Sequence, residues 1–315
     1  MPGPSPSSEA LRCPLCGREV APGDRFCEVD GTPLDDQAAF EVLAQATDLA
    51  AASHRGRAHQ VDEDAFALGR RERGGLTLQV LVVCDGVSAS SHGEQASTRA
   101  AQAALDALLS TADDPGLLDR EAALRKAVRA AHRAACTAGI EMAPGKDPPG
   151  TTLVAALVQD GRVDVIWVGD SRAYLLGPAP AGGTLPEAAL LTHDHSWVNQ
   201  VVDSGEMTAA EALRSPGAHA LTRCLGPLEN PDPDQPPEPS YATAAAVAGG
   251  RLIVCSDGLW NSAAGPAEIA ALASPLPPAA DARALALHLV RRGLAGGGRD
   301  DVTAAVAFLE ETESK

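Results

Sequence analysis

The fold of this chain is decided by one short stretch, Leu78-Gln79-Val80-Leu81-Val82-Val83-Cys84-Asp85-Gly86, in which an apolar run ends in an acid and a glycine. Five consecutive apolar residues, three of them valines, predict a strand that is buried on both faces. Nothing within such a strand explains a carboxylate at its end. The pattern recurs at Arg251-Leu252-Ile253-Val254-Cys255-Ser256-Asp257-Gly258. The sequence therefore predicts two buried strands that carry two carboxylates, Asp85 and Asp257, on a rigid scaffold.

Asp-Gly also favours a tight hairpin turn, and the chain offers a direct comparison. Asp160-Gly161 has apolar strand residues on both sides, as a hairpin requires. Asp85-Gly86 is followed instead by Val87, a run of small residues and a helical stretch. We therefore interpret Asp160 as a turn residue and Asp85 as a functional one.

Length and charge limit the classes of protein to consider. The 315 residues suffice for two or three average domains, or for one large two-sheet domain with a small appendage. With 42 acids against 25 bases, the net charge of -17 argues against nucleic acid or an anionic membrane as the main partner. The N-terminus lacks the features of a signal peptide, and no apolar run is long enough to span a bilayer. We expect a soluble, cytoplasmic protein.

The cysteines indicate a small metal site near the N-terminus. Cys13-Pro14-Leu15-Cys16-Gly17 and Phe26-Cys27-Glu28-Val29-Asp30-Gly31 have the two-knuckle spacing of a zinc ribbon, with an aspartate where a fourth cysteine is usual. Redox chemistry is the alternative for Cys-x-x-Cys, but the second knuckle and the lack of a surrounding βαβ pattern disfavour it. We predict a ribbon over residues 1–36 that resembles those preceding many bacterial signalling domains and that serves a protein partner. Its one Zn²⁺ would be held by Cys13, Cys16, Cys27 and Asp30.

Residues 37–49 carry no strong signal and are either a linker or the first strand of the next domain, which we assign to residues 50–310. Residues 151–176 form an expected meander of three strands, and antiparallel hairpins exclude a purely parallel doubly wound sheet. A His193-Asp194-His195 run on an expected loop is a weaker candidate metal site. Apolar periodicity and its interruptions predict helices at residues 93–110, 121–138, 197–203, 207–213, 268–273 and 281–292, and a closing strand at 302–309.

Acidic residues recur at four strand ends or adjoining loops. Clustered carboxylates repel and raise one another's pKa unless cations neutralise them, so convergence of these four positions implies bound divalent metal. Carboxylate and carbonyl oxygens select Mg²⁺ or Mn²⁺ rather than zinc, and Gly86 would let its carbonyl approach a metal. The four positions are Glu63-Asp64, Asp85-Gly86, Asp257-Gly258 and Asp300-Asp301.

Eight short motifs stand in one order: Glu-Asp, Asp-Gly, Gly-Thr-Thr, Gly-Asp-Ser-Arg, Asp-His-Ser, Leu-Thr-Arg-x-Leu-Gly, Ser-Asp-Gly-Leu-Trp and Asp-Asp-Val-Thr. This order resembles the metal-dependent (PPM, type 2C) serine/threonine protein phosphatases over roughly residues 50–309. The resemblance implies an α+β fold, a four-layer α-β-β-α sandwich of two antiparallel sheets packed face to face with helices outside. It also implies a binuclear metal centre at one edge between the sheets.

The resemblance assigns roles position by position. It implies two Mn²⁺ or Mg²⁺ ions with Asp85 between them, and a third, weaker site shared by Asp170 and Asp257. A hydroxide between the metals would attack phosphorus in line, without a phosphoenzyme and without a cysteine nucleophile. Cys84 and Cys255 are then small buried core residues. The remaining implied roles are Glu63 and the Gly86 carbonyl on one metal, Asp257 and Asp300 on the other, and Asp64 orienting metal-bound water.

Several positions depart from the family pattern. His59 replaces an arginine that commonly grips phosphate four residues before the metal-binding glutamate, which leaves His59 with Arg57, or Arg55, as the expected phosphate contacts. None of the departures removes a core metal ligand. The others are Asp62 and Asp301 in place of asparagines, Val87 in place of a general-acid histidine, and Asn261 in place of a second aspartate.

We therefore interpret the chain as a metal-dependent protein serine/threonine phosphatase that acts on phosphoproteins and opposes a serine/threonine kinase. The alternative is a weak or inactive phosphatase-fold module that binds a partner and is tethered through its ribbon. A two-metal phosphodiesterase or nuclease would share the ligands, but the acidic composition and the motif order disfavour it.

Overall fold

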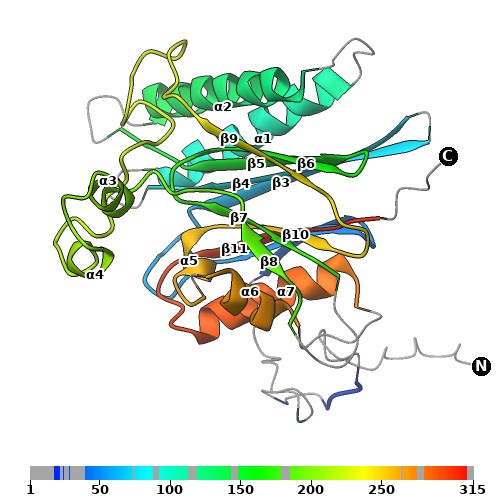
Figure 1. Cartoon of the computed structure of the whole chain (residues 1–315). Helices are drawn as coiled ribbons and strands as arrows, with labels where there is room; N and C mark the ends of the chain where they lie inside the picture. Colours follow the sequence, from blue (N-terminus) through cyan, green and yellow to red (C-terminus); the bar gives the residue numbers. More distant parts are fainter. Residues whose placement is uncertain are drawn as a thin grey trace, which may run out of the picture.

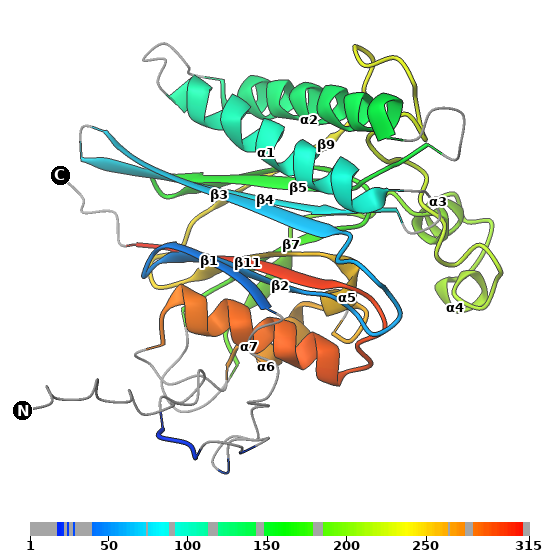
Figure 2. The same ribbon diagram turned by 180° about the vertical axis from the view of Figure 1, so that it is seen from behind.

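The computed structural model of the chain describes residues 18–21, 24, 28, 40–73, 75–87, 92–112, 119–142, 148–178, 185–263, 265–274 and 280–310. Two antiparallel sheets pack face to face, and helices cover their outer faces (Figures 1 and 2). The predicted α+β sandwich is confirmed in this arrangement of sheets and helices. The predicted zinc ligands, Cys13, Cys16, Cys27 and Asp30, lie outside the described residues.

Among the described residues, five strands form one sheet and six form the other. The five-stranded sheet has the order β3 (Asp64–Arg73), β4 (Leu76–Asp85), β5 (Leu153–Gln159), β6 (Arg162–Val168) and β9 (Ser240–Ala245). The six-stranded sheet has the order β1 (Phe40–Ala46), β2 (Leu49–His54), β11 (Val302–Phe308), β10 (Arg251–Cys255), β7 (Arg172–Leu176) and β8 (Ala188–Leu190).

The helices divide between the two outer faces and one end of the sandwich. Helices α1 (Gly93–Ala112) and α2 (Arg120–Met142) cover the five-stranded sheet, while α5 (Asp257–Trp260), α6 (Pro266–Ala273) and α7 (Ala282–Ala295) lie on the side of the six-stranded sheet (Figure 1). Helices α3 (Trp197–Asp203) and α4 (Ala209–Ala212) stand at one end. None of the helices in the described part of the chain has the length and apolar character that crossing a membrane requires.

The two Asp-Gly strands are buried on both faces, as predicted. In β4, Leu81 and Val83 pack between the sheets, whereas Val82 and Cys84 pack under α1 and α2. In β10, alternate residues divide in the same way between the inter-sheet core and the core beneath α7. Each strand end is thus held by packing on both sides, which makes its carboxylate rigid.

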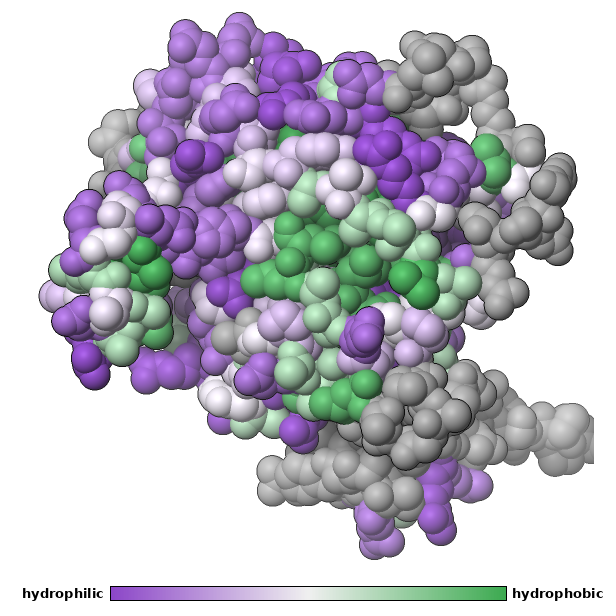
Figure 3. All heavy atoms as spheres, viewed as in Figure 1, coloured by the Kyte–Doolittle hydropathy of each residue, from purple (hydrophilic) through white to green (hydrophobic). Residues whose placement is uncertain are grey.

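In space-filling view the face of Figure 1 is largely hydrophilic over α2, with an apolar area near β7 and β8 (Figure 3).

The structure decides two expectations about strands, one for residues 37–49 and one for residues 151–176. The segment 37–49 was expected as a linker or as a first strand, and the structure shows strand β1 from Phe40, paired with β2. The expected meander over residues 151–176 is wrong in its third strand: β7 does not pair with β6 but crosses to the other sheet, where it pairs with β10. The apolar pattern of a buried strand is the same in either sheet, so sequence could not separate these pairings. The Asp160-Gly161 hairpin is confirmed, with positive φ at both residues.

Candidate metal centre

The first pair of acidic positions meets across the β3–β4 ladder. Asp64 and Asp85 are register partners at the end of the two strands. The Gly86 N–H donates to the Glu63 carbonyl at 3.0 Å. A Cβ on Gly86 would lie 2.7 Å from Gly93 C and 2.8 Å from Glu63 O, so only glycine fits there. A Cβ on Gly93 would lie 3.4 Å from the Glu63 carboxyl carbon and 3.3 Å from Gly86 Cα, which puts that carboxyl group beside Gly86.

The second pair of acidic positions meets across the β10–β11 ladder. Asp257 follows β10 and begins α5, and Asp300 and Asp301 precede β11. Because β10 and β11 are antiparallel neighbours, the end of one lies at the start of the other. Asn261, the C-cap residue of α5, donates from its side-chain amide to Asp257 Oδ2 at 3.2 Å.

These strand ends open on one cavity of about 520 Å³. Asp85, Gly86, Asp170, Asp257 and Asp300 all line it. Asp64 is 8 % exposed and does not line the cavity. Its Oδ2 accepts a hydrogen bond from the Ser256 hydroxyl at 2.7 Å, and its Oδ1 has no hydrogen-bond partner among the described residues. The structure therefore brings the four predicted acidic positions to one edge between the sheets.

Burial and neighbouring charges raise the pKa values of three carboxyl groups in the cavity. Burial raises the pKa of Asp85 well above its usual range, and the charges of Asp64, Asp257, Asp170 and Asp300 raise it further. Burial followed by the charge of Asp257 raises the pKa of Asp170 to about 7. Burial followed by the charge of Asp300 raises the pKa of Asp257 to about 6, although hydrogen bonds from Asn261 and with Asp85 act in the opposite direction. Such a cluster is the environment that a divalent cation neutralises.

The donor set fits hard divalent cations in kind, since the cavity is lined by carboxylates and by Gly86, which has no side chain to cover its backbone. Within the described ranges, no three His, Cys, Asp or Glu side chains are arranged as a ready ligand set for one ion. The argument for divalent cations therefore rests on three observations: the acids share one cavity, the backbone approaches closely at Gly86, and the carboxylate charges are not fully neutralised by cationic side chains of the described residues.

Arg57 and His59, two of the three expected phosphate contacts, differ in their surroundings. Arg57 is exposed, and its backbone N–H donates to the Gly298 carbonyl at 2.8 Å. The His59 ring lies instead between two acids, with Nδ1 2.8 Å from Asp301 Oδ2 and Nε2 3.6 Å from Asp300 Oδ1. Neither side chain lines the cavity.

The His193-Asp194-His195 run is not a joint metal site. Asp194 pairs with Arg172 at 2.6 Å, whereas His193 pairs with Asp203 at 2.7 Å. The ring of His195 accepts a hydrogen bond from the Gly169 N–H at 3.1 Å, and burial lowers its pKa to about 4. The three side chains have separate partners and do not form one ligand set.

Sequence reasoning assigned no role to the opposite wall of the cavity. That wall comes from the loop after α4, and its polar side chains include His219, Arg223 and Glu229. Arg223 is held by the Glu238 carbonyl at 3.0 Å and lies 3.2 Å from His195 Nε2. The signal was present in the Leu-Thr-Arg-x-Leu-Gly motif, but the sequence does not show that this loop faces the acids. Cys84 and Cys255 are fully buried, as expected, and burial raises the pKa of both thiols.

Residues 50–291 match the family described as protein phosphatase 2C. The chain belongs to the protein phosphatase 2C family. It is 34% identical over 258 residues to the serine/threonine protein phosphatase PstP of Mycobacterium tuberculosis, a match that covers 82% of this chain and 44% of PstP. It is 31% identical over 182 residues to the serine/threonine phosphatase stp of Listeria welshimeri, covering 58% of this chain and 67% of stp. The chain thus spans less than half the length of PstP.

Solved structures of this protein phosphatase 2C family share the fold. A crystal structure of M. tuberculosis PstP has a TM-score of 0.65 and 31% identity, covering 86% of this chain and 99% of that one. A structure of the PstP catalytic domain in complex with two manganese ions has a TM-score of 0.62 and 30% identity, with the same coverage. The family assignment made from the eight ordered motifs is therefore confirmed.

Proposed function

We propose that this chain is a metal-dependent protein phosphatase that hydrolyses phosphoserine and phosphothreonine in proteins. The observation that carries the proposal is the gathering of Asp85, Asp170, Asp257 and Asp300, from the ends of strands in both sheets, around one cavity in which burial and neighbouring charges raise the pKa values of Asp85, Asp170 and Asp257. The names of the relatives PstP and stp, both serine/threonine phosphatases, support the same activity.

The proposed ligands of two Mn²⁺ or Mg²⁺ ions come from this edge of the sandwich. Asp85 would lie between the ions, and Asp170 would join Asp257 at a weaker third position. The manganese-containing structure of the PstP catalytic domain supports the choice of metal. When bound, such ions make water a stronger nucleophile and stabilise charge on a phosphoryl group. The other proposed ligands are Glu63, the Gly86 carbonyl, Asp257 and Asp300.

The side chains of the protein would prepare the substrate and the water. The Ser256 hydroxyl holds one oxygen of Asp64, and Asp64 is the proposed residue that orients metal-bound water. Arg57 is exposed on the loop before Glu63 and is the proposed contact for substrate phosphate. We further expect the protein to act in the cytoplasm against a serine/threonine kinase, and the N-terminal ribbon with its zinc to bind a protein partner.

The test is turnover of a phosphoserine or phosphothreonine peptide by the full-length protein with and without Mn²⁺. Asp85→Ala and Asp257→Ala should each lower kcat by at least about a hundredfold, because charge stabilisation at the phosphoryl group is lost. Asp106→Ala, on the exposed face of α1, is the matched control and should be unchanged. Unchanged turnover in Asp85→Ala would reject the binuclear reading. Absence of Mn²⁺-dependent turnover in the wild-type protein would favour the non-catalytic binding module.

A further inference from the structure

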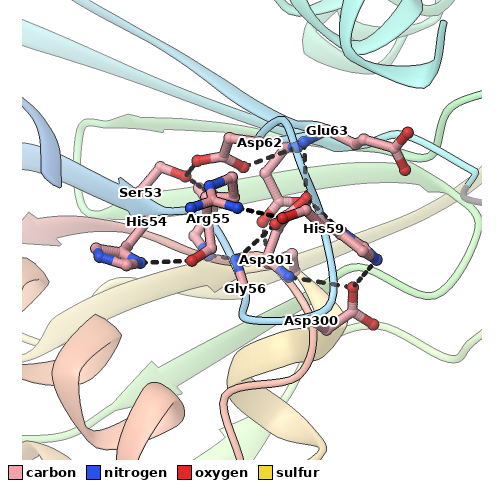
Figure 4. A network of polar contacts seen from close by, with 12 residues as sticks. Ser53, His54, Arg55, Gly56, His59, Asp62, Glu63, Asp300 and Asp301 are labelled. Carbon is pink, nitrogen blue, oxygen red and sulfur yellow. Dashed lines mark hydrogen bonds and ion pairs between the residues drawn. The ribbon is translucent and has the colours of Figure 1, made fainter. Parts of the chain in front are cut away.

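Asp301 follows the proposed ligand Asp300 and is only 3 % exposed. Its carboxylate accepts hydrogen bonds from the Gly56 N–H at 2.7 Å, from the Glu63 N–H at 2.7 Å and from His59 Nδ1 at 2.8 Å (Figure 4). Because a carboxylate only accepts hydrogen bonds, His59 Nδ1 carries the hydrogen. One buried side chain thus satisfies three donors.

All three donors belong to the loop between β2 and β3, which ends at the proposed ligand Glu63. This loop lies directly on the chain that carries Asp300. The Arg57 N–H donates to Gly298 O at 2.8 Å, and the Ala58 N–H donates to Arg299 O at 3.0 Å. A Cβ on Gly56 would lie 2.3 Å from the carbonyl carbon of Asp300, so the contact requires glycine. Asp301 therefore joins two segments that lie more than 200 residues apart in the sequence.

The hydrogen bonds of Asp301 with Gly56, His59 and Glu63 form a clamp that acts on both proposed ligands, Glu63 and Asp300. It holds the backbone of Glu63, whose side chain points away from Asp301 in Figure 4. It holds Asp300 through the adjoining peptide bond, and His59 reaches both acids with its two ring nitrogens. The His59 ring, held in this way, is not among the groups that line the cavity.

We propose that Asp301 is a positioning residue that fixes Glu63 relative to Asp300, and that His59 belongs to this clamp and does not contact substrate phosphate. The inference rests on the proposed function, because it concerns two of the proposed metal ligands. Asparagine is the residue that the family pattern would supply at position 301. In this chain, asparagine could not accept all three hydrogen bonds. Its amide offers one accepting oxygen and one N–H₂ donor, so it would leave a buried N–H of Gly56, Glu63 or His59 facing another donor.

The first test measures Mn²⁺ binding directly. Mn²⁺ is titrated into metal-free full-length wild-type protein, Asp301→Asn and Asp301→Ala, and binding is followed by calorimetry or by the electron paramagnetic resonance signal of free Mn²⁺. We expect both variants to bind Mn²⁺ about 10- to 100-fold more weakly, the usual effect of losing a residue that orients a metal ligand. Asp164→Asn is the control. Asp164 is also fully buried and accepts from Arg120 and Arg162, so its variant should lower thermal stability while leaving Mn²⁺ affinity unchanged.

Wild-type Mn²⁺ affinity in both Asp301 variants would overturn the positioning role. Failure of the wild-type protein to bind Mn²⁺ would overturn the proposed function, and with it this inference. The two failures are distinguishable because the first leaves wild-type binding and turnover intact.

The second test separates the two roles of His59. In His59→Ala we expect Mn²⁺ affinity to fall about fivefold, equivalent to about one net hydrogen bond, and KM for a small phosphoester at saturating Mn²⁺ to stay unchanged. His59→Asn should retain near wild-type affinity, because its amide nitrogen can replace Nδ1 as the donor to Asp301. A raised KM at saturating Mn²⁺, with unchanged Mn²⁺ affinity, would assign His59 to the substrate and overturn its part in the clamp.

Discussion

Asp170→Asn tests whether the carboxylates of the cavity repel one another in the metal-free protein. Asp170 lines the cavity, and burial, the charge of Asp257 and the charge of Asp194 raise its pKa to about 7, although Arg172 acts in the opposite direction. An unfolded aspartate titrates near pH 3.9. The folded state therefore binds this proton more tightly than the unfolded state. The resulting stability is fully present below about pH 4 and is lost as the pH rises through about 7.

The size of the effect follows from this difference in pKa. A separation of about three pH units corresponds to an upper limit of about 4 kcal/mol. Asp170 is partly exposed, and solvent screening reduces the expected cost of its charge at pH 8 to roughly 1–2 kcal/mol. Asparagine has the same shape and no charge. Metal-free Asp170→Asn should therefore melt about 2–8 °C above wild type at pH 8, and less than half of that gain should remain at pH 5.

The assay is thermal unfolding in the presence of a chelator, followed by circular dichroism at both pH values. Asp106→Asn, which removes an exposed charge on α1, is the control and should not differ from wild type at either pH. Saturating Mn²⁺ should decrease or reverse the difference in melting temperature between Asp170→Asn and wild type, because the wild-type carboxylate is then neutralised by the metal. A variant less stable than wild type at pH 8, or a gain of equal size at pH 5 and pH 8, would refute the repulsion argument.

Two further predictions address Gly86 and the proposed N-terminal zinc ribbon. Gly86→Ala should abolish Mn²⁺-dependent turnover, because its Cβ would meet backbone atoms at 2.7 and 2.8 Å, whereas Gly297→Ala, with nothing within 4 Å, should keep wild-type activity. Full activity in Gly86→Ala would contradict the close backbone approach. The full-length protein should carry one zinc by elemental analysis, and Cys13→Ser should release it. A chain lacking residues 1–38 should keep turnover of a small phosphoester, because β1 begins only at Phe40; loss of that turnover would show that the ribbon supports the catalytic domain.

The sequence by itself determined the parts of this protein that depend on local pattern. The run that ends at Asp85 is apolar at every position from Val80 to Cys84, and such a run requires cover on both faces wherever it lies. The Asp160-Gly161 turn follows from residues that tolerate positive φ. The helical spacing predicted α1 and α2 to within a few residues, and the order of eight motifs was sufficient to identify the family.

The tertiary structure alone decided which strands become neighbours and which polar groups meet. Strand β7 crosses to the second sheet because it completes the pairing of β10, a choice that depends on residues about 80 positions further along the chain. His59 meets Asp301 across 242 residues, and the wall that faces the acids comes from a loop whose position follows from the packing of both sheets. Spacing in a sequence expresses the preferences of the backbone over a few residues. Hydrogen bonds and charges between distant segments depend instead on how whole strands align, and that alignment is set only when the two sheets pack together.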